Sequence, residues 1–533
     1  MELTAASRAI AMLLLLAGAF FRPSAAAEPQ TLRLQAAVGD PGDLVYIPFQ
    51  VPAGIARMEV MYLEGTPQSI GLGVFDPRGK DFFGLGFRGI AGAERRSFAL
   101  AGNQATLGFV AGGLPAGEWN VVIPNYGASG VAKLGVRLYS GESAPPPVLE
   151  PVPEQVMAKA GWYRGDLHVH TEHSSDAWSS GAALSPAAMA TRAKDRGLDF
   201  IALTDHNVST QNDALQSAQP EDFLLLAGGE VTTWRAGPGH MIVAGLQSGE
   251  FFDWRFRPVH GFFAEPVRSW TAPERPIQPA LDYAQARDIY TSAAHPFVAP
   301  GFGSNWGFFG DSDQDPAALP DALEVWNNDF FISGGTAALA RWDTELRRGR
   351  RLCGNGGSDV HGVGGDTEVG LPTTVVFATE LSRAAVVAAL QACRAYITSA
   401  PDGPALLLTG VGPHGRSVMM GDTLIGGAED RARISARVIG GKGAWLIVTQ
   451  GGKLQLAREV DQDDGTYSTV IRLDGPGAVR AELWPAPVAA PLGLGPLALS
   501  NPIFYGPMPP LPLRAPLTDA YRQTALESFP GRP

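Results

Sequence analysis

Histidine is confined to one part of this chain, and that confinement limits what the chain can fold into. Eight of the nine histidines lie between His168 and His361, and only His414 lies outside this stretch. His168 and His170 end a short apolar run, and residues two apart on a strand point to the same face. Two imidazoles on one face can bind a single ion. We therefore expect a fold that brings the histidines of this stretch together.

The pattern from 161 to 400 alternates short apolar runs with helical segments. In the first unit, Ser185 suits a helix N-cap and Pro186 suits the first helical position. The apolar run 200–203 is then predicted to be the next strand. Repetition of strand and helix over this length favours an α/β fold, either a parallel barrel or an open sheet. In a barrel, the strand ends meet at one rim, where active sites form.

Side chains that bind metals follow several of these apolar runs. Any one of them alone is compatible with a surface pair, a core histidine or a helix cap, but so many at strand ends are hard to explain as packing. Imidazole and carboxylate together suit Zn²⁺, Mn²⁺ or Fe²⁺. More ligands are present than one tetrahedral ion needs, which predicts two or three divalent ions. Besides His168 and His170, the set comprises Asp205, His206, Glu230, His295, Asp359 and His361.

Two β-rich regions flank this stretch. Residues 28–140 alternate apolar and polar positions between turn signals, which predicts a β-sandwich domain. Residues 141–160 form a proline-rich linker. After the metal-binding domain at 161–400, residues 401–533 alternate again, and we expect a small C-terminal β-domain with a tail.

Residues 1–27 have the pattern of a secretory signal peptide, with a short apolar core and the cleavage site Ala25-Ala26-Ala27. An uncleaved anchor is the alternative, although the apolar run is short for a membrane span. We expect a periplasmic or secreted protein without stable membrane insertion after cleavage. The net charge of −12, with no basic run, argues against a nucleic-acid partner. A small-molecule substrate remains, and it can be anionic because bound metals make a site locally positive.

The chain has two cysteines, Cys353 and Cys393. An oxidising compartment would permit a disulfide between them. We favour the simpler interpretation, that they are two small buried residues without a bond. Their spacing does not match a cysteine-based zinc site.

Four segments resemble the motifs of the PHP (polymerase and histidinol phosphatase) superfamily. They are GDLHVHT at 165–171, TDHN at 204–207, AHP at 294–296 and SDVHG at 358–362. WYRGD at 162–166 and EVWN at 324–327 are similar to the CehA/McbA branch of these metallohydrolases. The resemblance covers 162–400, which is under half of the chain. It implies a distorted (β/α)7 barrel with up to three metals.

The resemblance also implies how the ligands divide among the metals. The first metal would be bound by His168, His170, Glu230 and Asp359. The second would share Glu230 and use His295 and His240. The third would be bound by His206, His361 and Asp176, although Ala177 stands where the family has a turn glycine after that aspartate. Glu230 is then the expected bridge.

The expected activity is that of an exported multinuclear hydrolase in which a metal-activated water attacks the substrate. Asp205 would orient that water or His206, or would simply cap a helix. Superfamily breadth favours phosphoesters. The modest supply of arginines, at Arg235, Arg255 and Arg257, leaves carboxylic esters, carbamates or amides of the CehA type as an alternative. A non-catalytic envelope-binding protein with structural metals is the other alternative. His173 is expected to face solvent, whereas His260 and Arg235 either contact an anionic substrate or leaving group or lie at the surface.

Overall fold

The computed structural model describes residues 28–529 except for several internal segments. These are 41–42, 81–83, 146, 175, 177–182, 233–238, 253–255, 260–261, 267–276, 299–305, 307–318, 365–366, 487–494 and 507–516. The expected signal sequence, Arg235, Arg255 and His260 lie outside the described residues, as does the side chain of Arg257. Within the described part of the chain, no helix has the length and apolar character needed to cross a bilayer.

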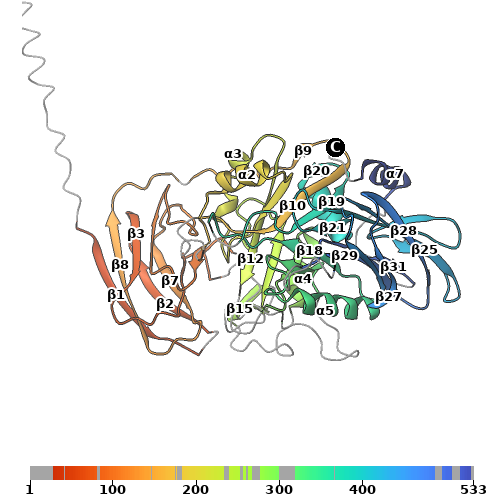
Figure 1. The fold of residues 1–533 in the computed structure, drawn as a ribbon. Helices are drawn as coiled ribbons and strands as arrows, with labels where there is room; N and C mark the ends of the chain where they lie inside the picture. The colour runs from red at the N-terminus through yellow and green to blue at the C-terminus, as the bar shows by residue number, and fades with distance from the viewer. Residues whose placement is uncertain are drawn as a thin grey trace, which may run out of the picture.

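The N-terminal region consists of two four-stranded antiparallel sheets packed face to face. One has the order β1-β8-β3-β6 and the other β2-β7-β4-β5. Alternating residues point inward, so that Trp119, Val121 and Ile123 of β7 lie in one apolar core with residues of the other sheet. This β-sandwich lies at one end of the molecule (Figure 1). The strands are β1 (Gln30–Ala37), β2 (Leu44–Val51), β3 (Ile55–Tyr62), β4 (Leu72–Phe75), β5 (Phe87–Ala91), β6 (Ser97–Ala101), β7 (Gly117–Pro124) and β8 (Val131–Ser140).

The middle of the molecule is built on a curled mixed sheet. Its strands follow the order β18-β17-β16-β13-β12-β11-β10-β19-β21. They are fully buried over most of their length, which explains their nearly continuous apolar sequences. The strands are β10 (Gly161–Val169), β11 (Phe200–Leu203), β12 (Leu224–Thr232), β13 (His240–Ala244), β16 (Tyr290–Ala294), β17 (Ala322–Asn327), β18 (Cys353–Gly357), β19 (Thr373–Ala378) and β21 (Ala395–Thr398).

Helices and short elements connect these strands. The helices are α2 (Pro186–Asp195), α3 (Leu215–Ala218), α4 (Gln278–Ala286), α5 (Gly335–Arg347) and α6 (Arg383–Gln391), with the 3-10 turn η2 (Thr210–Asn212). Ser185 caps α2 as expected, because its hydroxyl accepts a hydrogen bond from the Ala188 amide. Two small antiparallel pairs join β9 (Gln155–Met157) with β20 (Leu381–Ser382), and β14 (Phe256–Val259) with β15 (Phe262–Pro266).

The curl brings the two ends of the strand series together. A parallel bridge joins Val169, at the end of β10, to Val360, just after β18. The His170 amide donates to the Val360 carbonyl at 2.9 Å, and the Asp359 amide donates to the His168 carbonyl at 2.8 Å. Two segments that each carry candidate ligands are thereby held side by side.

The expectation of parallel strands alternating with helices is correct only in part. β10, β11 and β12 are parallel, and so are β16, β17 and β18, but β13 is antiparallel to both of its neighbours. The reason is the short segment 233–239 between β12 and β13, since a parallel pair needs a crossover of about a dozen residues or more. The protein is therefore a mixed, strand-rich α/β structure.

The C-terminal strands continue the same sheet. β21 pairs with β30, and the sheet extends through β29 and β26 to β27, so that 15 strands of the described chain belong to it. A second sheet has the order β23-β22-β25-β28 and packs on this extension. The expected boundary after residue 400 thus falls within a continuous sheet. The strands are β22 (Ala405–Val411), β23 (Ser417–Met419), β24 (Thr423–Leu424), β25 (Arg431–Ile439), β26 (Trp445–Gln450), β27 (Lys453–Glu459), β28 (Asp464–Arg472), β29 (Gly477–Trp484), β30 (Ala498–Ser500) and β31 (Ile503–Tyr505).

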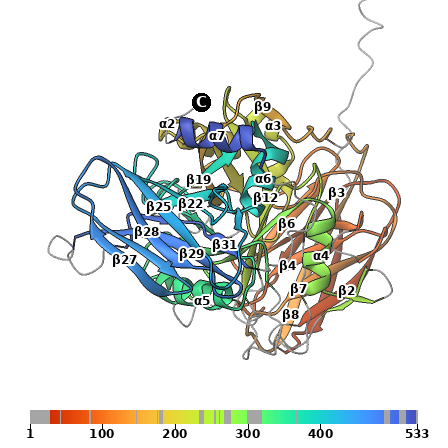
Figure 2. The same ribbon diagram turned by 90° about the vertical axis from the view of Figure 1, so that its right-hand side faces the viewer.

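The last helix, α7 (Asp519–Ser528), returns to the central sheet (Figure 2). The indole of Trp162, on β10, donates a hydrogen bond to the Ala525 carbonyl at 2.9 Å. The same indole packs edge-on against Phe529, with ring centroids 5.3 Å apart. The end of the chain is therefore tied to the strand that carries His168.

Cys353 and Cys393 form a disulfide, so the interpretation of two unbonded cysteines was wrong. Cys353 begins β18 and Cys393 follows the end of α6, and both are buried. The 40 residues between them in sequence gave no sign of this proximity, which arises only when α6 packs against the sheet.

Replacing both cysteines with alanine is expected to destabilise the protein. A disulfide across this span stabilises by roughly 2 to 4 kcal/mol, because the open chain loses entropy when the loop is closed. Urea unfolding of the double variant and of the wild type, each with and without a reducing agent, measures the difference. A reductant should lower the stability of the wild type and leave the double variant unchanged. Equal stability of both proteins under oxidising conditions would contradict the prediction.

Candidate metal centre

Six strands of the sheet bring eight of the predicted ligands to one place. β10 supplies His168, and His170 follows its last residue. Glu230 lies within β12, and His240 begins β13, opposite Thr232. His206, His295, Asp359 and His361 stand just after β11, β16 and β18. Each strand stops where its side chains turn polar, so the curled sheet collects these groups on one rim.

Glu230 is at the centre of the cluster. Its side chain is fully buried, and both carboxylate oxygens face imidazole nitrogens. Oε1 lies 2.7 Å from His240 Nδ1 and 3.1 Å from His295 Nε2. On the other side, Oε2 lies 3.0 Å from His206 Nδ1, 3.2 Å from His168 Nε2 and 3.3 Å from His170 Nε2.

Asp359, which follows β18, contacts two of the same histidines. Its Oδ1 lies 3.2 Å from His168 Nε2 and 3.1 Å from His170 Nε2. Ligand atoms of these three residues and Glu230 lie within 4.8 Å of one another, a spacing that one ion can span. These four residues are the set that the resemblance assigned to the first metal.

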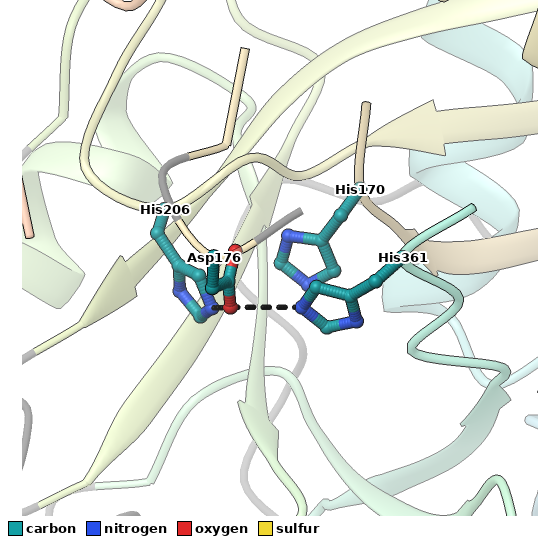
Figure 3. A group of neighbouring side chains, drawn as sticks. All are labelled: His170, Asp176, His206 and His361. Atoms are coloured by element: carbon teal, nitrogen blue, oxygen red, sulfur yellow. Dashed lines mark hydrogen bonds and ion pairs between the residues drawn. The ribbon is translucent and has the colours of Figure 1, made fainter. Parts of the chain in front are cut away.

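A third carboxylate, Asp176, lies between His206 and His361, as Figure 3 shows. Its Oδ2 lies 2.8 Å from His206 Nε2 and 2.9 Å from His361 Nε2. The rings of His170 and His361 are stacked, with centroids 4.0 Å apart. His170, Asp176, His206 and His361 thus form another group with the spacing of a metal site, one ligand larger than the set expected for the third metal.

The remaining group consists of His206, Glu230 and His240. His295, which the resemblance placed with Glu230 and His240, also reaches Glu230 Oε1, but His206 completes the closest set. All nine predicted ligands are therefore gathered around Glu230, Asp359 and Asp176. The three groups share members, so ions bound there would be neighbours.

The charge of the cluster suits cations. Every ion-pair partner that the structure gives Glu230 and Asp359 is a histidine. Burial alone would raise the pKa of Glu230, but His206 and the other histidines hold that pKa well below its usual range. The pKa of Asp359 is held low in the same way, by His168 first. Glu230, which is fully buried, and Asp359, which is half-buried, therefore stay ionised, and bound cations would balance their charge.

The pKa values of the histidines shift in two opposite directions. Burial lowers the pKa of His240 to about 4, which keeps its imidazole in the neutral form that binds metals. For His361, burial also favours the neutral form, but the charge of Asp176 outweighs it and raises the pKa to about 10. The negative field that holds a proton on His361 would equally attract a divalent ion.

Two of the predicted ligands have a strained backbone, and one of them also has a buried nitrogen without a partner among the described residues. His295 has φ +27° and Asp359 has φ +55°, conformations that are rare for residues with side chains. His295 Nδ1 is buried and has no hydrogen-bond partner among the described residues. A buried nitrogen without a partner is costly unless an ion or water fills its place. With the mixed imidazole and carboxylate donors, these observations fit divalent metals.

Sequence reasoning gave no role to Glu324, which lies on β17 behind the cluster. Its carboxylate lies 3.1 and 3.2 Å from His168 Nδ1 and accepts a 2.8 Å hydrogen bond from the His295 amide. Asn327 donates to the same carboxylate at 3.0 Å. A carboxylate behind a ligand histidine fixes its tautomer and orientation. The available signal was a glutamate inside an apolar run, since a buried carboxylate requires partners.

Asp205 and His173 both contact residues of the loops near the cluster, and His173 departs from its expected exposure. Asp205 is buried, and its carboxylate accepts hydrogen bonds from the amide and hydroxyl of Thr171, at 2.6 and 2.9 Å. It thus holds the loop after β10, and the structure gives it no hydrogen bond to His206. His173 is half-buried instead of facing solvent, with Nδ1 2.8 Å from Thr210 Oγ1. Both side chains anchor the loop that leads from His170 to Asp176.

Comparisons with known proteins leave the family open. No family model matches the chain, and no curated protein matches it. Among solved structures, an amidohydrolase from Chromobacterium violaceum is similar at 16% identity and a TM-score of 0.24, covering 38% of this chain and 89% of that one. A β-glucuronidase from Parabacteroides merdae is similar at 10% identity and a TM-score of 0.17, covering 90% of this chain and 64% of that one. Neither TM-score establishes a shared fold.

Replacing Glu324 with glutamine is expected to weaken metal binding. The glutamine side chain has no charge and only one acceptor oxygen. It cannot replace both the contact with His168 Nδ1 and the hydrogen bond from the His295 amide, so these two histidines lose their fixed orientation. Loss of such a partner lowers metal affinity by about 10- to 100-fold. Competition between the protein and a chromophoric chelator measures this affinity directly. Glu459→Gln, on the exposed strand β27, is the control, and equal affinities for the two variants would contradict the role of Glu324.

Replacing Gly357 with alanine is expected to disturb the same contact. A Cβ at Gly357 would lie 2.4 Å from Glu324 Oε1 and 2.5 Å from His168 Cβ, both closer than van der Waals contact allows. Overpacking of this kind costs roughly 1 to 3 kcal/mol of stability. We expect a lower unfolding midpoint and fewer bound metal ions. At Gly113 a Cβ would meet nothing within 4 Å, so Gly113→Ala should change neither measurement.

Proposed function

We propose that this protein is a multinuclear metal-dependent hydrolase. The observation that carries the proposal is the position of Glu230, a buried carboxylate that faces histidines from four different strands or strand ends. A carboxylate and histidines arranged in this way match the donors of sites that hold two or three divalent ions. Packing alone would not require so many polar groups in one buried place.

The chemistry divides between the ions and the chain. Divalent ions bound there would supply a water of lowered pKa and would stabilise negative charge on the substrate. The chain's part is to hold the ligands still. Ser174 Oγ donates to Asp176 at 2.7 Å and accepts from the His206 amide at 3.2 Å. Thr232 Oγ1 lies 2.5 Å from His206 Nδ1, so two short side chains fix the ligands that Figure 3 shows.

The finer assignment that we propose is to the PHP superfamily, in a branch like CehA/McbA. Two observations support it. The sequence motifs fall on the strand ends that carry the cluster. In addition, β10, β11, β12, β13, β16, β17 and β18 follow one another around the curl, and the bridge between Val169 and Val360 brings the last beside the first. Such an arrangement is expected of a distorted (β/α)7 barrel.

For the substrate, we propose phosphoesters, and the only reason is that relatives in the PHP superfamily include phosphoesterases. One observation favours the alternative of a carboxylic ester, carbamate or amide. Phosphate sites commonly add arginine or lysine to the metals. In the described part of the cluster, Glu230 and Asp359 pair with histidines, and neither pairs with an arginine or a lysine.

Export is part of the proposal. The pattern of residues 1–27 supports it, and so does the bond between Cys353 and Cys393, because disulfides persist in oxidising compartments. Fractionation of expressing cells, with a blot for this chain, locates the protein. Recovery in the cytoplasm alone would contradict this part and leave the hydrolase proposal intact.

A substrate panel tests the activity. The metal-free protein is reloaded with Zn²⁺, Mn²⁺ or Fe²⁺ and assayed on aryl phosphomonoesters, phosphodiesters, carboxylic esters and carbamates. We expect turnover of one class, with at least two ions bound per chain by elemental analysis. Fewer than two ions and no turnover of any class would instead favour a non-catalytic envelope-binding protein.

His168→Ala should abolish that turnover, because His168 approaches both Glu230 and Asp359. His414→Ala is the matched control, since His414 is exposed and lies outside the cluster. The control should keep wild-type activity. Unchanged activity in His168→Ala would refute the placement of the active site.

A further inference from the structure

A large cleft lies between the β-sandwich and the central sheet. None of the nine predicted metal ligands lines it, although His173, from the loop between His170 and Asp176, does. It has a volume of about 1730 Å³. Three parts of the chain line it: the sandwich, the linker near Leu149, and the segments around η2 and α4 of the central region. Ligand sites form preferentially at such junctions between domains. Nothing in the proposed hydrolase reaction uses this space.

The walls of the cleft are largely apolar. Leu85, Leu107 and Leu114 come from the sandwich, and Phe251 comes from the segment after β13. Leu85 is 78% exposed and Leu149 is 39% exposed, which is unusual for large apolar side chains on either side of one cleft. An apolar group of a ligand would cover them.

The positive charges of the cleft are already matched. Arg287 Nε pairs with Glu250 at 2.8 Å. Arg78 pairs with Asp76, and Arg88 binds Asp76 together with three backbone carbonyls. None of these arginines is left to neutralise another carboxylate of the cleft.

Asp213 is the exception. It follows η2 and lines the cleft, yet among the described residues its carboxylate has no hydrogen bond and no ion pair. Burial raises the pKa of Asp213 to about 7, with no positive charge to offset it. The cleft therefore offers one half-buried carboxylate whose charge no side chain of the described residues balances.

We propose that this cleft binds an organic ammonium compound with an apolar body, whose charged nitrogen pairs with the Asp213 carboxylate. The apolar body packs against Leu85, Leu149 and Phe251. An ammonium group supplies both the charge and the donors that this part of the wall lacks. The site is separate from the metals, so it stands whether or not the hydrolase proposal is correct.

Calorimetric titration of the full chain tests the proposal. The probes are phenethylamine, tryptamine and n-octylamine, each compared with a neutral or anionic analogue: 2-phenylethanol, 3-phenylpropionate and octanoate. We expect at least one amine to bind with one site per chain, and to bind more tightly than every analogue. Binding should be the same for metal-loaded and chelator-treated protein, which distinguishes the cleft from the metal centre.

Asp213→Asn should weaken amine binding by about tenfold or more, as expected for loss of one charge-assisted hydrogen bond. Asp195→Asn, an exposed change at the end of α2, is the matched control and should bind like the wild type. Thermal unfolding gives a second measurement, because the amine should raise the midpoint of the wild type and not that of Asp213→Asn. No binding by any amine, stronger binding of an anion, or equal binding by both variants would overturn the proposal.

Discussion

Burial of ionised carboxylates at the strand ends is the constraint on which this structure depends. Removing a carboxylate from water costs several kcal/mol unless opposite charge and hydrogen bonds replace the water. Glu230 meets this requirement through histidines from β10, β13 and the segments after β11 and β16. The curl of the sheet is what brings those segments within reach of one side chain. The positive φ angles at His295 and Asp359 are the local strain that accompanies this convergence.

Polar side chains around the ligands hold the geometry of the cluster in place. Glu324 fixes His168 and the backbone of His295, Ser174 fixes Asp176 and His206, and Asp205 holds the loop between them. Asp166, two residues before His168, accepts from the amides of His168, Ser358 and Gly370. Burial raises the pKa of Asp166 to about 6, and those three donors oppose the rise. The ligands therefore sit in a frame of buried polar contacts rather than on mobile loops.

Sequence patterns indicated the parts of this arrangement that local spacing controls. The period of two in a strand was enough to pair His168 with His170, and apolar runs located the strands that precede Glu230 and Asp359. Such patterns could not show the direction of a strand or which residues far apart in the sequence come into contact. The antiparallel course of β13 follows from the length of the segment before it, and the bond between Cys353 and Cys393 follows from the packing of α6. Glu324 was missed because its partners are 156 positions away for His168 and 29 for His295.

The continuity of the sheet across residue 400 affects how the chain can fold during its synthesis. β21 pairs with β19 on one side and with β30 on the other, and Tyr396 and Trp162 pack against Phe529 near the end of the chain. The β-sandwich can fold on its own as soon as β8 has been synthesised, because its two sheets contain only residues before 141. The region that carries the candidate metal site has no such independence. Until β30 and α7 leave the ribosome, β21 has an open edge that can pair with another chain.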